Sequence, residues 1–93
     1  MSCCTILEGI VKARINLILF RILELIEDFK QGKVNESNVI KRFEFYKSKL
    51  VELIDFCRCF RTKKLVEEIL EKDLKSLVNE NFDWKIRTYF IYK

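Results

Sequence analysis

Apolar side chains recur at steps of three and four residues in the first third of the chain. This spacing puts them on one face of an α-helix, because about 3.6 residues make one turn. Thr5 and Glu8 have the spacing of a capping box, in which each side chain accepts a hydrogen bond from an unpaired backbone N–H of the first turn. Gly32 suits the left-handed residue that commonly ends a helix. The pattern predicts a first helix over about residues 5–31, so apolar that more than one neighbour has to cover it.

A second apolar pattern alternates steps of four and three residues over three heptads. Asn35 precedes it and has a side chain suited to cap a helix. We therefore predict a second helix over about residues 36–60. A heptad seam can face a helix of the same chain or a second copy of the chain. We favour the first, an antiparallel hairpin, because the first helix offers a partner after a short turn. The seam consists of Val39, Phe43, Tyr46, Leu50, Leu53, Cys57 and Phe60.

After Phe60 the apolar positions move to another face, and oppositely charged pairs such as Glu68–Lys72 follow at a spacing that supports a helix. They predict a third helix over about residues 63–79, either separate from the second helix or continuous with it. Residues 82–93 alternate like a strand but also fit one face of a helix. A short helix is favoured there, because no second strand is predicted to pair with a lone one. These elements predict one all-α domain: an antiparallel helical hairpin, a third helix and a short C-terminal segment, packed as a helical bundle.

The composition narrows the classes of function. The chain has 93 residues, with no histidine, no proline and only two glycines. Without histidine there is no imidazole base, and two isolated glycines cannot form a phosphate-binding loop. We therefore expect no enzyme, no catalytic residues, no cofactor and no small-molecule substrate. The most apolar stretch, residues 15–26, is too short to span a membrane. We expect a soluble protein of the cytoplasm, or of the host cytoplasm if the chain is viral.

Four cysteines form two local pairs, Cys3–Cys4 and Cys57–x–Cys59. In an antiparallel hairpin that turns near Lys33, opposed residue numbers sum to about 66, because both helices rise equally per residue. This would gather the four thiols at the open end of the hairpin. Three states are open, of which reduced thiols, with Cys57 in the core, are favoured. The others are a disulfide from the N-terminal arm to the second helix, as found in hyperthermophilic hosts, and a structural zinc or iron–sulfur site, although the ligand spacing is unusual for one.

The 18 basic residues exceed the 14 acidic ones, and two basic features stand out. One lies at the junction of the second and third helices, and the other interleaves with aromatic residues in the C-terminal segment. Cations beside exposed aromatics could contact phosphates and stack on bases. We favour solvated cations with the aromatics buried over the core, because acidic residues elsewhere oppose non-specific binding. The candidate cations are Arg58, Arg61, Lys63, Lys64, Lys85 and Arg87, and the aromatics are Trp84, Tyr89, Phe90 and Tyr92.

Residues 22–60, with the Gly32 turn and the heptad-patterned second helix, resemble the small dimeric helical-hairpin proteins. These include Rop-like RNA-binding regulators of plasmids and small adaptor-like proteins of crenarchaeal viruses. The resemblance implies a homodimeric four-helix assembly that acts through its surface, and it assigns no functional residues. We expect a homodimeric, non-enzymatic interaction or adaptor protein of a virus or plasmid in a thermophilic archaeon, with a macromolecular partner. The alternative is a nucleic-acid-binding regulator that uses the cluster at 58–64 and the aromatic-basic segment.

Overall fold

The computed structural model describes the backbone of residues 6–91 and the side chains of residues 9–91. This part of the chain forms helices only, so the all-α prediction is confirmed. None of these helices is long and apolar enough to cross a bilayer. The helices are α1 (Ile6–Gln31), α2 (Glu36–Ile54), α3 (Phe60–Leu70), α4 (Leu74–Asn79) and α5 (Phe82–Ile91).

The turn between α1 and α2 is built by the residues that the sequence marks as helix ends. Gly32 has a φ of +66°, which favours glycine because other residues carry a Cβ. Its N–H donates to the carbonyl of Phe29, and the N–H of Lys33 donates to the carbonyl of Asp28. This pair of bonds is the Schellman motif, which satisfies carbonyls that the helix end leaves unpaired. The Asn35 side chain then caps α2 by accepting a hydrogen bond of 3.2 Å from a backbone N–H of its first turn.

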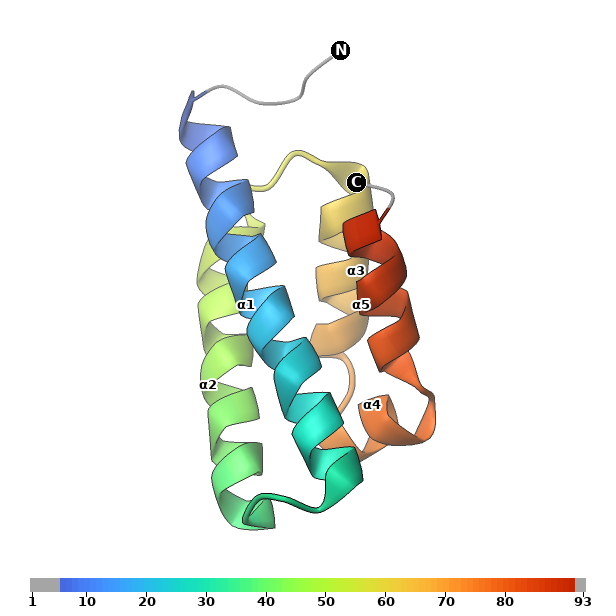
Figure 1. Ribbon diagram of the computed structural model, residues 1–93. Coiled ribbons are helices and arrows are strands. Elements are labelled where there is room, and N and C mark those ends of the chain that lie inside the picture. The colour runs from blue at the N-terminus through green and yellow to red at the C-terminus, as the bar shows by residue number, and fades with distance from the viewer. Residues whose placement is uncertain (1–5, 92–93) are drawn as a thin grey trace.

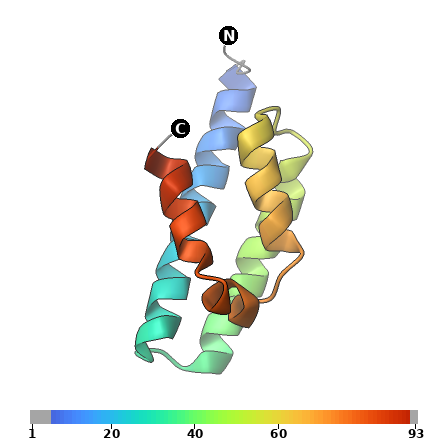
Figure 2. The same ribbon diagram turned by 90° about the vertical axis from the view of Figure 1, so that its right-hand side faces the viewer.

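The helices form two layers. α1 and α2 lie side by side and run in opposite directions, and α3, α4 and α5 cover one side of this pair (Figures 1 and 2). α3 packs on α2, whereas α4 and α5 pack on α1. The wide apolar face of α1 is therefore covered from two directions. Its fully buried side chains are Ile15, Leu19, Ile22 and Ile26, which meet Phe43 and Leu50 of α2 and Leu77 and Ile86 of the second layer in one core.

The second helix is shorter than the heptad pattern predicts. α2 ends at Ile54 instead of near residue 60, and residues 55–59 form the connection to α3. Cys57 is buried although it lies in this connection, so its seam position predicted its burial but not its conformation. Phe60 begins α3, before the predicted start near residue 63, and is 77% exposed. Its predicted place on the buried seam is wrong, because the chain leaves the direction of α2 before reaching it.

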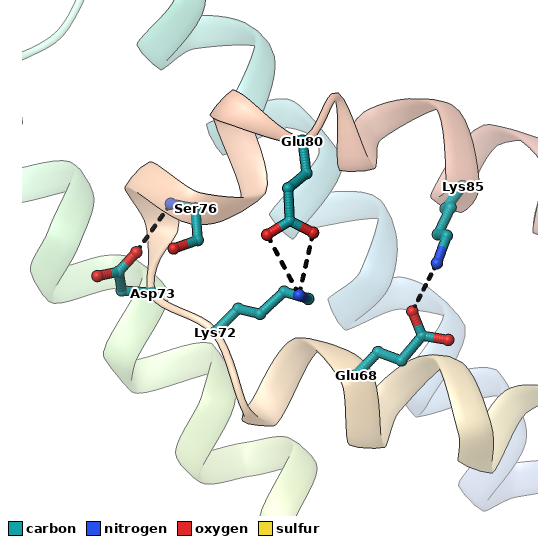
Figure 3. Close-up of polar contacts among 6 residues, drawn as sticks. All are labelled: Glu68, Lys72, Asp73, Ser76, Glu80 and Lys85. Carbon is teal, nitrogen blue, oxygen red and sulfur yellow. Dashed lines mark hydrogen bonds and ion pairs between the residues drawn. The ribbon is translucent and has the colours of Figure 1, made fainter.

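The predicted third helix is divided into α3 and α4, and polar contacts explain the division (Figure 3). The Asp73 carboxylate accepts a hydrogen bond of 2.8 Å from the N–H of Ser76 and so caps α4. Lys47 of α2 donates to the carbonyl of Lys72 at 2.9 Å, which satisfies a carbonyl left unpaired where α3 ends. The Lys72 ammonium also pairs with Glu80 at 3.0 Å. These contacts hold the corner at which the chain leaves α2 and turns towards α1.

The C-terminal segment is helical, as the sequence favours, and an ion pair fixes where α5 starts. Asn81, with a φ of +54°, precedes α5. Lys30 in the last turn of α1 places its Nζ 2.9 Å from Asp83 Oδ1 and 3.1 Å from Asn81 Oδ1. The Asp83 side chain is almost buried, and the Lys30 ammonium is the cation beside its carboxylate. The contact joins the end of α1 to the beginning of α5.

Candidate binding groove

A groove of about 500 Å³ lies between α3 and α5, the two helices that flank the face seen in Figure 2. Its floor contains Leu65 of α3 and Tyr89 of α5, which are both buried. Its rims carry Phe60 and Trp84, which are 77% and 65% exposed. Large aromatic side chains in this position leave apolar surface in water, and such surface commonly marks a binding site.

The floor is held by hydrogen bonds that join three helices. The Tyr89 hydroxyl donates to Asn16 Oδ1 of α1 at 2.5 Å, and it lies 2.8 Å from the hydroxyl of Thr62 on α3. Thr62 is fully buried, so its hydroxyl cannot bond to water in place of the Tyr89 oxygen. Burial raises the pKa of Tyr89, which therefore stays neutral at physiological pH. This network fixes α3 and α5 on either side of the groove.

Three cations line the groove, and each has a defined neighbour. The Arg61 guanidinium donates to the carbonyl of Tyr89 at 3.1 Å and lies over the ring of the same residue. Lys85 forms an ion pair of 2.7 Å with Glu68, which crosses from α5 to α3 (Figure 3). The Lys64 Nζ lies 6.0 Å from the centre of the Phe60 ring on the rim. The groove thus has apolar walls, a net positive charge and one carboxylate.

The six cations singled out in the sequence do not form one surface. Arg61, Lys64 and Lys85 line the groove. Arg87 instead pairs with Glu27 of α1. Arg58 and Lys63 also lie outside the groove lining. Arg58 is in the connection before α3, and Lys63 is an exposed residue of the first turn of α3.

The tail aromatics divide between core and surface. Tyr89 is buried, as the favoured interpretation expects, but Trp84 is exposed, and for that residue the interpretation is wrong. In a helix, Phe82, Ile86 and Tyr89 share one face, and this face packs on the core. Trp84 falls on the opposite side. Helical spacing applied to the whole segment would have placed Tyr89 and Trp84 on different faces. It would also have placed Thr88, which lines the groove, beside Trp84.

The thiols of Cys57 and Cys59 are both free, and they differ in environment. Cys57 is buried, and burial raises its pKa. Cys59 precedes the first turn of α3, where the Thr62 hydroxyl lowers its pKa to about 7 by stabilising the thiolate, assisted by backbone N–H groups of that turn. Cys3 and Cys4 lie outside the described residues, so the gathering of four thiols stays a prediction. Among the residues that are described, no three Cys, Asp or Glu side chains are placed to hold a metal ion.

Comparisons with protein-family models, with curated proteins and with solved structures find no match to this chain.

Proposed function

We propose that the chain is a non-enzymatic interaction protein that holds a partner protein in the groove between α3 and α5. The observation that carries this proposal is the pair of exposed aromatic side chains, Phe60 and Trp84, that flank a buried and hydrogen-bonded floor. Exposed aromatic residues beside a pocket are typical of the anchors that dominate protein–protein binding. Because the floor is already ordered, a partner would lose little binding energy to ordering the groove.

The nucleic-acid alternative is the second candidate, and the gathering of Arg61, Lys64 and Lys85 near Trp84 favours it. Cations of this kind contact phosphates while an aromatic ring stacks on a base. Two features argue for a protein instead. Lys85 already pairs with Glu68, and Arg87 pairs with Glu27 on another face, so two of the candidate cations are engaged by carboxylates of the chain itself.

A homodimer is also proposed, with α1 as the helix that pairs. Ile10, Leu17 and Phe20 are about half exposed on α1, and Ala13, also exposed, completes the spacing of a heptad seam. A seam with this spacing fits a second helix with the same repeat, and a second copy of α1 has it. A dimer would present two grooves and could join two partners. Light scattering at micromolar concentration should give twice the mass of the chain for the wild type and the mass of a single chain for Leu17→Glu. A monomeric wild type would remove the proposal.

Site-specific photocrosslinking tests the protein-binding function. A benzophenone amino acid replaces Thr88, which lines the groove, and in a matched variant it replaces Ser48, an exposed residue of α2 outside the groove. In extracts of the source cells, adducts should form at position 88 and not at position 48, and they should disappear when Trp84 is changed to Ala. Digestion of the adduct by protease and not by nuclease supports a protein partner. Nuclease-sensitive adducts would support the alternative, and identical adducts at both positions would contradict the groove as the site.

A further inference from the structure

The length of the groove sets the size of the segment that it can hold. The contact of Arg61 with the Tyr89 carbonyl bridges one end, and the pair of Lys85 with Glu68 bridges the other. Residues 61 and 68 are two helical turns apart, which corresponds to about 10 Å along α3. Both rim aromatics are largely exposed to solvent. A small ligand on the floor would leave their outer surfaces in water, whereas an element lying along the groove would cover both.

The backbone chemistry of the groove selects a helix over an extended segment. An extended peptide leaves its own N–H and C=O groups unpaired and usually adds to the edge of a sheet. The walls here are helices, whose backbone groups are paired internally, and the described part of the chain has no strand. A helical segment satisfies its own backbone and presents apolar side chains at i, i+4 and i+7, which spans two turns. Such a segment would extend the layer of α3 and α5 by one helix.

The charge of the groove selects an acidic segment. The lining includes Arg61, Lys64 and Lys85 and a single carboxylate, Glu68. Because Lys85 pairs with Glu68 and Arg61 donates to the Tyr89 carbonyl, Lys64 is the cation of the lining that is placed to meet a partner. Lys64 extends from the exposed rim beside Phe60, where it can meet a carboxylate at the flank of a bound helix. Complementary charges at a rim mainly raise the association rate and the specificity, and salt weakens them.

We infer that the groove between α3 and α5 binds an amphipathic helix of a partner protein, with bulky apolar side chains against Phe60, Leu65 and Trp84 and with carboxylates facing Lys64. The inference rests on the proposed protein-binding function and names its partner class. The apolar side chains of the helix exclude water from the two rim aromatics. Its carboxylates set the orientation and reject segments with basic flanks.

A pair of synthetic helical peptides tests this inference. Each has about 14 residues, roughly four turns, with leucine at i, i+4 and i+7, the two turns that the groove can cover. One carries glutamate at its flanking positions and the other carries lysine at the same positions. Neither contains tryptophan, so the single tryptophan of the protein, Trp84, reports on the groove. The glutamate peptide should move Trp84 emission to shorter wavelengths, bind about tenfold more tightly than the lysine peptide, and lose this advantage at high salt.

Two neighbouring lysines provide a matched control. Lys64→Glu should weaken binding of the glutamate peptide by about fivefold or more, whereas Lys63→Glu should change it less than twofold. Both substitutions reverse one charge at an exposed position of α3, but only Lys64 lines the groove. Circular dichroism confirms that both variants keep their helical content. Equal effects of the two substitutions would show a non-specific response to net charge and overturn the inference.

The remaining outcomes separate the inference from the function on which it rests. If both peptides bind equally, or neither binds while position 88 still crosslinks to a protein, the acidic helix is wrong and the protein-binding function stands. If a single-stranded RNA of about 12 nucleotides quenches Trp84, depends on Lys64 and displaces the glutamate peptide, the groove belongs to the nucleic-acid alternative and both proposals fail.

Discussion

The hydroxyl group of Tyr89 allows a quantitative test of how the groove is held together. Tyr89→Phe removes one oxygen and leaves the ring in place. The fully buried hydroxyl of Thr62 then loses one of its partners and keeps the other, Cys59, and Asn16 loses a donor. A hydrogen bond contributes about 1 kcal/mol to stability, and the Tyr89 hydroxyl makes two. We therefore expect the substitution to lower the free energy of unfolding by about 2 kcal/mol, the sum of the two lost bonds.

Urea denaturation, followed by circular dichroism, measures this effect. With an m-value of about 1 kcal/mol/M for a chain of this size, the midpoint should fall by about 2 M. Thr62→Val removes the other hydroxyl. The double variant should lose less than the two single variants together, because each single variant breaks the bond between the two hydroxyls and the double variant breaks it only once. As a control, Tyr46→Phe removes a hydroxyl that bonds to no described residue and should cost less than about 0.5 kcal/mol. A comparably small cost for Tyr89→Phe, or strictly additive single effects, would refute the reasoning.

Three further predictions concern an ion pair, a thiol and a turn. Asp83→Asn removes the charge that Lys30 contacts and should lower the free energy of unfolding by about 2 kcal/mol in urea titration, and a loss below about 0.5 kcal/mol would contradict the role of the pair. Alkylation of Cys59 by iodoacetamide, measured by mass spectrometry, should reach half its maximal rate near pH 7, the value of its lowered pKa. Alkylation of Cys57 should reach half its maximal rate only in more alkaline solution, because burial raises its pKa. Coincident pH profiles of the two thiols would contradict this prediction. Because folding lowers the pKa of Cys59, its ionisation should add stability that is fully present above about pH 9 and is lost as the pH falls from there through about 7. Gly32→Ala forces a Cβ into a left-handed conformation and should lower the melting temperature by several degrees, corresponding to about 1 kcal/mol, and an unchanged temperature would argue against the turn geometry.

The beginning of the fold was predictable because it depends on local signals. The spacing of apolar residues in α1 is long and regular, and the end of α1 and the start of α2 are marked by Gly32 and Asn35. These residues act through bonds to neighbours a few positions away, which a sequence displays directly. The connection at 55–59 was not predictable in the same way. Cys57 keeps the heptad spacing while it lies outside a helix, since a side chain can be buried from a loop as well as from a helix.

The groove depends on distant contacts, and for this reason the sequence revealed only part of it. Cations were recognised near residues 61 and 85, but nothing local indicates that Lys64 and Lys85 meet on one surface while Arg87 turns to α1. That outcome requires α5 to lie on α1 with a particular face inward. The helical alternative for residues 82–93 contained this information, because Ile86 then faces the core and Trp84 does not.

The position of α1 between α2 and α5 has a consequence for synthesis of the chain. Asn16 and its partner Tyr89 are 73 residues apart. At about 5–20 residues per second, a ribosome adds that length in roughly 4–15 s. During this interval α1 can pair with α2, but the side of α1 that α5 covers has no cover from its own chain. A nascent chain therefore displays this apolar surface for seconds, until α5 emerges.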